Sequence, residues 1–276
     1  MTISVSIVDA FTDVPFRGNP AGVVILREPR DAAWMQDVAS ELKHSETAFV
    51  VVPETVAEKG AAAGATTRDG ADEPLPLRWF TPVAEVDLCG HATLAAAHVL
   101  GGHRTFSTRS GLLHCVAEPD GRVEMDFPAD PQTPVEVTPA ILACLDGATP
   151  VSVTQGREDY LVRLADVETV RSLAPDLAAV AALPGARGLI VTAADGPASI
   201  VSRCFFPAYG IPEDPVTGSA HCTLASFWSP LLGVTELEAE QASERGGRLR
   251  LRIEGERVHL SGHGVTVLSG TLNDGW

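Results

Sequence analysis

Two stretches of the chain place a glycine among small and polar residues in a pattern that suits carboxylate binding. One is Cys89-Gly90-His91-Ala92 and the other is Thr217-Gly218-Ser219-Ala220. Each follows an aromatic residue, prolines and acidic residues, and each leads into a small-residue run that predicts a helix. A glycine at a helix N-terminus leaves backbone N–H groups at the positive end of the helix dipole, which favours an anion. The same pattern also lets a helix pack closely inside a sheet.

Glu46 is the candidate for proton transfer. It lies two positions before the apolar run at residues 48–52, which predicts a buried strand. Partial burial of a carboxylate raises its pKa, because desolvation disfavours the charged form. A carboxylate poised in this way can take a proton from one carbon and return it to another. The alternative is a solvated glutamate at a strand end or a helix-capping one.

Three further residues could assist. Asp214 lies in a proline-rich turn, where an aspartate can form the turn, cap a helix or position a neighbour. His91 and Ser219 lie at the two predicted helix starts, where each can bond to a substrate or to the backbone. The remaining histidines considered lack the spacing of metal ligands, so no metal site is predicted. They are His98, His103, His114, His221, His259 and His263.

Composition excludes several classes of protein. The 276 residues are 45% apolar, which is enough for one large domain or two smaller ones. With 20 basic and 36 acidic residues the net charge is −16, which disfavours nucleic acids and anionic membranes as partners. Five widely spaced cysteines predict no disulfide framework. The first residues resemble a strand and no apolar run approaches the ~20 residues of a membrane span, so we expect a cytoplasmic protein.

Short strands with few helices between them predict an α+β fold with antiparallel or mixed sheets. Three prolines within residues 128–134 predict a linker between domains at residues 1–127 and 135–276, with the last strand packing back on the first half. Residues 54–76 predict an excursion without periodic structure. The predicted helices are residues 32–42, 91–100, 141–145, 173–183 and 219–227, and separate strands are predicted at residues 257–260 and 265–268.

Several of these stretches resemble the phenazine-biosynthesis isomerase (PhzF-like) family, in order along nearly the whole chain. They are Asp9-Ala10-Phe11-Thr12, Gly18-Asn19-Pro20-Ala21-Gly22-Val23, Ser45-Glu46-Thr47-Ala48-Phe49, Arg78-Trp79-Phe80-Thr81-Pro82, Cys89-Gly90-His91-Ala92-Thr93, Glu213-Asp214-Pro215-Val216-Thr217-Gly218-Ser219-Ala220-His221 and Val265-Thr266-Val267-Leu268-Ser269-Gly270.

The resemblance implies two similar domains of the diaminopimelate-epimerase-like fold, each a sheet wrapped around a central helix, with the active site between them and a homodimer as the assembly. It implies an isomerase that transfers a proton without a cofactor. Glu46 would be the acid/base, aided by His91 and Asp214. The substrate-binding groups would be Ser45, Ser219 and the backbone N–H groups after Gly90 and Gly218, holding a small carboxylate substrate.

Cys89 leaves other readings open. Epimerases of this fold use two cysteines, and Cys89 falls at the first position, but the second position holds Thr217, whose hydroxyl is a poor base. An epimerase or a dehydratase acting through Cys89 is therefore one alternative, and a buried thiol that only packs is another. A protein that binds a small carboxylate without catalysis is a third.

Overall fold

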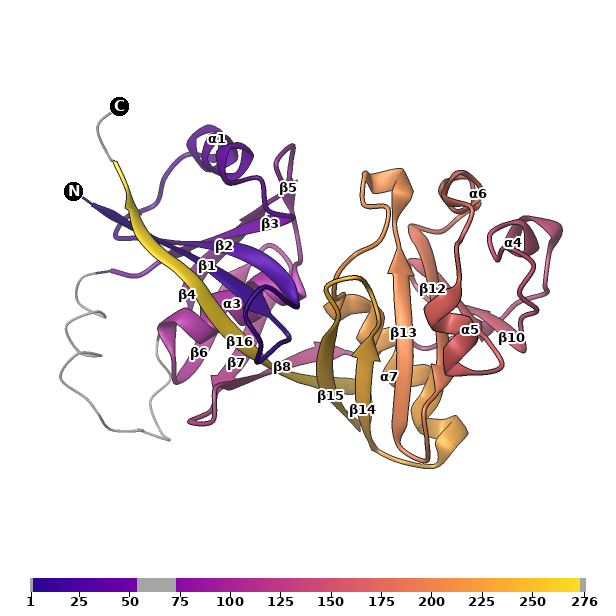
Figure 1. The fold of residues 1–276 in the computed structure, drawn as a ribbon. Coiled ribbons are helices and arrows are strands. Elements are labelled where there is room, and N and C mark those ends of the chain that lie inside the picture. Colours follow the sequence, from indigo (N-terminus) through magenta and orange to yellow (C-terminus); the bar gives the residue numbers. More distant parts are fainter. Residues whose placement is uncertain (1, 54–72, 274–276) are drawn as a thin grey trace. The chain divides into compact units, whose positions relative to one another are not determined.

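The chain folds as two units, described here from a computed structural model of residues 2–53 and 73–273 (Figure 1). Unit 1 comprises Met1–Asp126 and Gly262–Trp276, and unit 2 comprises Phe127–Ser261. Most of the excursion predicted at residues 54–76 lies outside the described residues. Its last two positions belong to a strand of unit 1.

Unit 1 is built on a mixed sheet whose strand order is β16-β1-β2-β3-β4-β6-β7-β8, with β5 paired to β4. The pairs β2–β3 and β4–β6 are parallel, and the other described pairs are antiparallel. The strands are β1 (Ile3–Ala10), β2 (Asn19–Leu26), β3 (Glu46–Val51), β4 (Leu75–Phe80), β5 (Glu85–Val86), β6 (His103–Thr108), β7 (Gly111–Ala117), β8 (Arg122–Pro128) and the later part of β16 (Arg257–Leu272).

The first helix, α1 (Ala32–Leu42), matches its prediction. The side chain of Asp31 accepts a hydrogen bond from the backbone N–H of Trp34 and so caps the helix N-terminus. Met35 and Ala39 are buried against β3 and its neighbours, and Trp34 meets Phe49 edge to face. The helix ends at Lys43, which adopts a left-handed conformation. It covers the sheet beside the strand that begins at Glu46.

The central helix of unit 1 is α3 (Gly90–Leu100), also as predicted. It packs against β1, β2, β3 and β7, and its residues from His91 to Ala97 are all buried. Alanines fill much of this buried stretch, so the backbone of the helix can approach the strands closely. The close packing that the sequence pattern allows is therefore present, and it leaves carboxylate binding at the helix start open.

Unit 2 repeats the architecture with strand order β9-β10-β11-β12-β13-β14-β15-β16. The pairs β11–β12 and β13–β14 are parallel, and the other described pairs are antiparallel. Its elements are β9 (Thr133–Pro134), α4 (Pro139–Ala143), β10 (Ser152–Gln155), β11 (Asp159–Arg163), α5 (Val167–Ser172), α6 (Leu177–Ala181), β12 (Gly188–Ala194), β13 (Ser199–Phe205), the 3-10 helix η1 (Pro207–Tyr209), α7 (Gly218–Leu232), β14 (Glu236–Gln241), β15 (Gly247–Glu254) and the first part of β16.

The sheet of unit 2 is covered on both faces. One core joins β11, β12 and β13 to α4, α5 and α6 through residues such as Val162, Val191 and Val170. On the opposite face, the indole N–H of Trp228 in α7 donates to Thr192, the neighbour of Val191, at 3.0 Å. Because alternate strand residues face opposite sides, α7 and the short helices lie on different faces. As α3 does in unit 1, α7 packs centrally here, against β11, β14 and β15.

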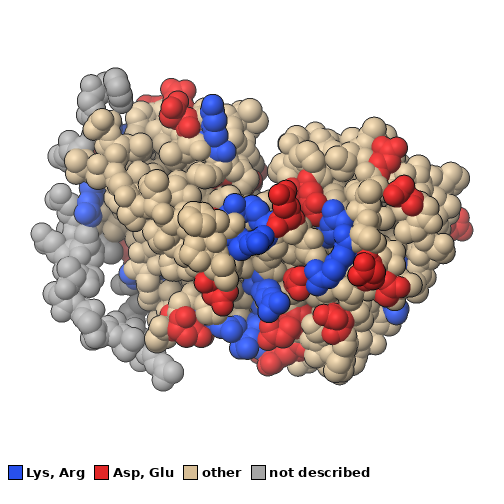
Figure 2. Space-filling view, viewed as in Figure 1, with Lys and Arg blue, Asp and Glu red and all other residues tan. Residues whose placement is uncertain are grey.

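Charged side chains of both signs alternate over β14 and β15 (Figure 2). The register sets Glu236, Glu238 and Glu240 opposite Arg252, Arg250 and Arg248, and Glu238 pairs with Arg250 at 2.5 Å. The intervening leucines and Ala239 are buried. This alternation is typical of a sheet with one face in water and one in the core, and the cross-strand pairs balance the charge of these two strands.

Three predicted elements are wrong in part. The helix predicted at residues 173–183 is shorter in the structure: only α6 (Leu177–Ala181) lies in that range, because Pro175 disfavours a helix there and Asp176 caps the later start. The helix α5, which Asp166 caps, lies before that range and was not predicted. The strands predicted at residues 257–260 and 265–268 are one strand, β16, which spans the division between the units. Within the predicted linker, Pro128 ends β8, and Thr133 and Pro134 form β9.

The α+β fold with mixed sheets around central helices is confirmed. The five cysteines are free thiols, all of them buried. Among residues 2–53 and 73–273, no helix combines the length and hydropathy needed to cross a membrane.

Candidate active site

One edge of the unit 1 sheet collects the polar residues that the sequence singled out. Because β2 and β3 are parallel with Ala21 beside Glu46, the residues that begin these strands lie at the same edge. Asn19 begins β2, and Ser45 precedes β3. The N-terminus of α3 meets this edge, since His91 contacts both Ser45 and Glu46. We call Asn19, Ser45, Glu46, Cys89 and His91 the Glu46 cluster.

The Glu46 cluster is held by short polar contacts around the imidazole of His91. Nε2 of His91 lies 3.3 Å from Oε2 of Glu46 and 3.4 Å from Oγ of Ser45. The Ser45 hydroxyl lies 3.2 Å from Oδ1 of Asn19, to which it can donate. On the other side of the ring, Nδ1 lies 3.5 Å from Sγ of Cys89. The Glu46 side chain is 15% exposed, so its carboxylate is largely removed from water.

Burial keeps the His91 ring neutral. Desolvation, with a smaller contribution from the nearby His44, lowers the pKa of His91 to about 3. At neutral pH the ring therefore carries one proton and offers one donor and one acceptor nitrogen. A neutral imidazole can donate a hydrogen bond to Glu46 without adding a positive charge beside it.

The donor atoms of Glu46, Cys89 and His91 all lie within 4.8 Å of one another, which is close enough to consider a metal ion. The thiol and the carboxylate, however, contact different nitrogens of the ring. The lone-pair directions of Nδ1 and Nε2 diverge, so a cation bound along one of them would lie away from the group that contacts the other nitrogen. The geometry fits a chain of hydrogen bonds better than a chelate.

The start of α3 leaves backbone N–H groups available. Cys89 is the N-cap residue in an extended conformation, and the structure describes no capping hydrogen bond from its side chain. The first intrahelical bond joins the N–H of Thr93 to the carbonyl of Cys89. The preceding N–H groups, those of Gly90, His91 and Ala92, therefore lie outside the helical ladder. They adjoin the Glu46 cluster, because His91 belongs to both.

The start of α7 in unit 2 has the same local geometry. Thr217 is its extended N-cap residue, again with no capping hydrogen bond described from its side chain. Instead, the Thr217 hydroxyl donates to Oδ2 of Asp214 at 2.5 Å. Gln241 accepts from the Thr217 N–H and donates to the Asp214 carbonyl, which fixes the turn between them. Asp214 is buried in this turn.

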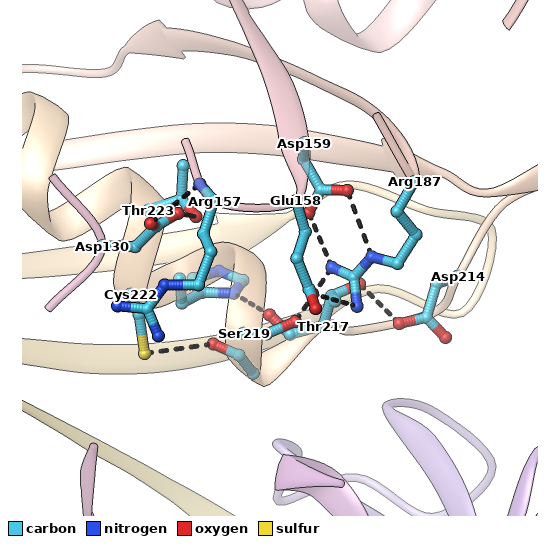
Figure 3. A network of polar contacts seen from close by, with 12 residues as sticks. Asp130, Arg157, Glu158, Asp159, Arg187, Asp214, Thr217, Ser219, Cys222 and Thr223 are labelled. Carbon is cyan, nitrogen blue, oxygen red and sulfur yellow. Dashed lines mark hydrogen bonds and ion pairs between the residues drawn. The ribbon is translucent and has the colours of Figure 1, made fainter. Parts of the chain in front are cut away.

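Ser219 lies in a charged network that the sequence did not predict (Figure 3). Arg187 binds Asp159 through two hydrogen bonds of 3.1 and 2.6 Å and donates to Oγ of Ser219 at 3.1 Å. It also pairs with Glu158 and lies over the ring of Phe206. Because the Ser219 oxygen accepts from Arg187, its own proton is directed elsewhere. We call Arg187, Asp159, Glu158 and Ser219 the Arg187 network.

Asp159 is the most deeply buried of the charged groups in this network, whereas Glu158 is exposed. Desolvation raises the pKa of Asp159, although its hydrogen bonds to Arg187 act in the opposite direction. Asp159 and Arg187 are nearly thirty positions apart in the chain and meet because β11 and β12 are adjacent parallel strands, with Asp159 beside Gly188. The signal in the sequence was only a charged residue at the start of each predicted strand, which is too common to indicate a site.

The predicted site residues thus fall into two groups. Ser45, Glu46, Gly90 and His91 meet in unit 1, joined by Cys89 and by Asn19, to which the sequence assigned no role. Asp214, Gly218 and Ser219 lie around the start of α7 in unit 2. A mixed sheet around a central helix in each unit is the arrangement expected for the diaminopimelate-epimerase-like fold.

Comparison with known proteins gives the family. The family model described as phenazine biosynthesis-like protein (PhzC-PhzF) matches residues 8–270. A Pseudomonas aeruginosa protein described as an uncharacterized isomerase is 46% identical over 272 residues, which cover 96% of each chain. The crystal structure of a PhzF-family phenazine biosynthesis protein from Enterococcus faecalis is 36% identical, with a TM-score of 0.88 over 99% of this chain and 100% of that one.

A more distant structure extends the likeness in fold. A predicted epimerase from Pseudomonas aeruginosa is 21% identical, with a TM-score of 0.67 over 98% of each chain. The chain therefore belongs to the phenazine biosynthesis-like (PhzF) family, and its class of enzyme is an isomerase. The resemblance noted in the sequence is confirmed.

Proposed function

We propose that this isomerase moves a proton between two carbon atoms of a small carboxylate substrate, with Glu46 as the acid/base and no cofactor. The observation that carries the proposal is the contact of 3.3 Å between Oε2 of Glu46 and Nε2 of His91, at a carboxylate that is 15% exposed. It combines a dehydrated base with a neutral hydrogen-bond donor at the start of α3.

The proposed reaction conserves protons and electrons. The Glu46 carboxylate accepts a proton as a C–H bond of the substrate breaks, and the electron pair of that bond is delocalised toward the substrate carboxylate. The new O–H bond of Glu46 then breaks as a C–H bond forms at a second carbon. Glu46 ends as it began, so the enzyme is neither oxidised nor reduced. His91 remains neutral and holds one carboxylate oxygen while the other transfers the proton.

The substrate carboxylate needs donors, and two observations in unit 1 support its binding there. The N–H groups of Gly90 and Ala92 precede the first intrahelical bond of α3, at the positive end of its dipole. Donors of this kind stabilise negative charge that develops in the transition state. Ser45 can add a further donor if its hydroxyl turns from Oδ1 of Asn19 toward the substrate.

The roles of the unit 2 residues stay predictions. The resemblance assigns Asp214 to catalysis and Ser219 with the Gly218 N–H to substrate binding. Two contacts support them: Asp214 is held in one orientation by Thr217, and Ser219 receives a hydrogen bond from Arg187 that leaves its proton for another acceptor. A cytoplasmic location and a homodimer also stay predictions.

A screen followed by an exchange assay tests the proposal. Small carboxylic acids, cyclic and open-chain, are first screened for those that raise the melting temperature. Each acid that binds is then incubated with the enzyme in D2O, and deuterium on carbon is measured by NMR. The proposal expects incorporation by the wild type and its loss in Glu46→Gln with binding retained. Glu41→Gln, on the exposed face of α1, is the matched control and should exchange normally.

A second candidate function rests on Cys89, whose thiol also lies against His91. An epimerase or a dehydratase that used Cys89 as its acid/base would lose all exchange in Cys89→Ala. The Glu46 mechanism expects that variant to retain part of its activity. Binding of acids without any exchange by the wild type would instead indicate that the chain only binds carboxylates.

A further inference from the structure

The two nitrogens of His91 face different chemical groups, and this asymmetry determines which one carries the proton. Nε2 faces the oxygens of Glu46 and Ser45, whereas Nδ1 faces the sulfur of Cys89. A neutral imidazole is a donor at one nitrogen and an acceptor at the other. The partners on each side therefore select between two forms of the ring, Nε2–H and Nδ1–H.

Both groups near Nε2 are acceptors. An ionised Glu46 carboxylate can only accept. The single hydroxyl proton of Ser45 can be given to Oδ1 of Asn19, at 3.2 Å, or to the carbonyl of Pro20, at 3.4 Å. Ser45 then presents a lone pair to the imidazole. Two acceptors beside one nitrogen favour the ring form with hydrogen on Nε2.

The opposite nitrogen is then an acceptor that needs a donor. Sγ of Cys89 lies 3.5 Å from Nδ1, within the distance of a hydrogen bond to or from sulfur, and both residues are buried. We propose that Cys89 is a positioning residue, which donates its thiol proton to Nδ1 of His91, keeps the ring in its Nε2–H form and so holds the Glu46 carboxylate in place for proton transfer. The effect on catalysis rests on the proposed function, whereas the state of the ring does not.

This assignment separates Cys89 from the catalytic thiols of epimerases. Because the pKa of His91 is lowered to about 3, the ring does not take the thiol proton, and a protonated thiol cannot remove a proton from a substrate. It acts through His91 and Glu46 and requires only a side chain that can donate at this position. Serine supplies such a donor and alanine does not, so these two substitutions test the idea as a pair.

NMR of protein labelled with 15N in its histidine rings gives a readout that needs no substrate. Protonated and unprotonated ring nitrogens resonate at clearly different frequencies, and a hydrogen bond to the unprotonated nitrogen shifts it further. The wild type should show His91 with hydrogen on Nε2. Cys89→Ala should shift the Nδ1 resonance toward that of an unbonded nitrogen, and Cys89→Ser should restore it. Cys115→Ala, which removes another buried thiol of unit 1, is the control and should leave His91 unchanged.

Two NMR results would overturn the proposal. One is hydrogen on Nδ1 of His91 in the wild type, and the other is an unchanged Nδ1 resonance in Cys89→Ala. The spectrum also reports whether each variant is folded, and Cys89→Ser keeps the test decisive if the alanine variant is not.

The exchange assay measures the catalytic consequence with whichever carboxylic acid the wild type labels. Cys89→Ala should lower the rate constant of exchange about tenfold, as the loss of one hydrogen bond would, with little change in the acid's KM. Cys89→Ser should stay within about threefold of the wild type. Wild-type exchange rates in Cys89→Ala would refute the positioning role, whereas exchange by Glu46→Gln would refute the proposed function and leave the ring assignment standing.

Discussion

Acidification from pH 8 to pH 5 should lower the free energy of unfolding, because two histidines are buried as neutral rings. Burial lowers the pKa of His91 to about 3 and that of His221 to about 4. The Nδ1 atom of His221 lies 2.7 Å from the carbonyl of Thr217, and its other ring nitrogen is enclosed without a described partner. Neither ring can gain a proton in the folded state at pH 5.

The size of this loss in stability follows from the difference in histidine pKa between the folded and the unfolded chain. In the unfolded chain each histidine has a pKa of about 6.5, so at pH 5 it binds a proton that the folded chain does not. Stability is therefore complete above about pH 6.5 and is lost as the pH falls below it. At about 1.4 kcal/mol per pH unit, protonation of each histidine in the unfolded chain lowers the free energy of unfolding by about 2 kcal/mol at pH 5, and the pair lowers it by about 4 kcal/mol. The pKa values of both histidines in the folded chain lie below 5, so the size of the loss depends mainly on their pKa in the unfolded chain.

Urea unfolding, monitored by circular dichroism at several pH values between 8 and 5, measures this loss. His221→Gln should remove about 2 kcal/mol of the loss at pH 5, even if it lowers stability at pH 8. Asp159, whose pKa is raised by burial, acts in the opposite direction. An unfolding free energy that stays constant or rises from pH 8 to pH 5 would refute the argument.

Two further changes concern stability. Arg187→Met should lower the free energy of unfolding by about 3 to 5 kcal/mol, because it leaves the carboxylate of Asp159, which is 3% exposed, buried without its ion-pair partner. Adding Asp159→Asn should recover part of this loss in urea unfolding. A double variant without any recovery would contradict the pairing. Asp31→Ala should lower the free energy of unfolding by about 1 kcal/mol, because it removes the cap of α1. Urea unfolding measures this change as well, and an unchanged midpoint would show that the cap contributes nothing.

Much of the fold could be predicted from local patterns. The helix at Ala32–Leu42 has an aspartate cap and an apolar stripe, and the two small-residue helices follow glycines, so their types were clear from the sequence. Boundaries set by a single residue were harder. A helix was predicted from residue 173, but Pro175 and the Asp176 cap delay its start to Leu177. The glycines of β16, in contrast, do not interrupt that strand, because its pairing with β1 and β15 outweighs the local turn preference.

The candidate site was predictable where its residues are neighbours in sequence. Ser45 with Glu46, and Gly90 with His91, belong to recognisable motifs, and the structure places them in one cluster. The contact of Cys89 with Nδ1 of His91 depends on the orientation of a ring, which no sequence pattern specifies. The pairing of Asp159 with Arg187 depends on which strands are adjacent, and that is decided by the tertiary fold.

The central claim is that Glu46 transfers the proton. The most direct measurement is deuterium incorporation from D2O into a bound carboxylic acid by three proteins in parallel: the wild type, Glu46→Gln and the surface control Glu41→Gln. We predict that the wild type and Glu41→Gln label the acid, while Glu46→Gln binds the acid and leaves it unlabelled. Labelling by Glu46→Gln at the wild-type rate would contradict the account.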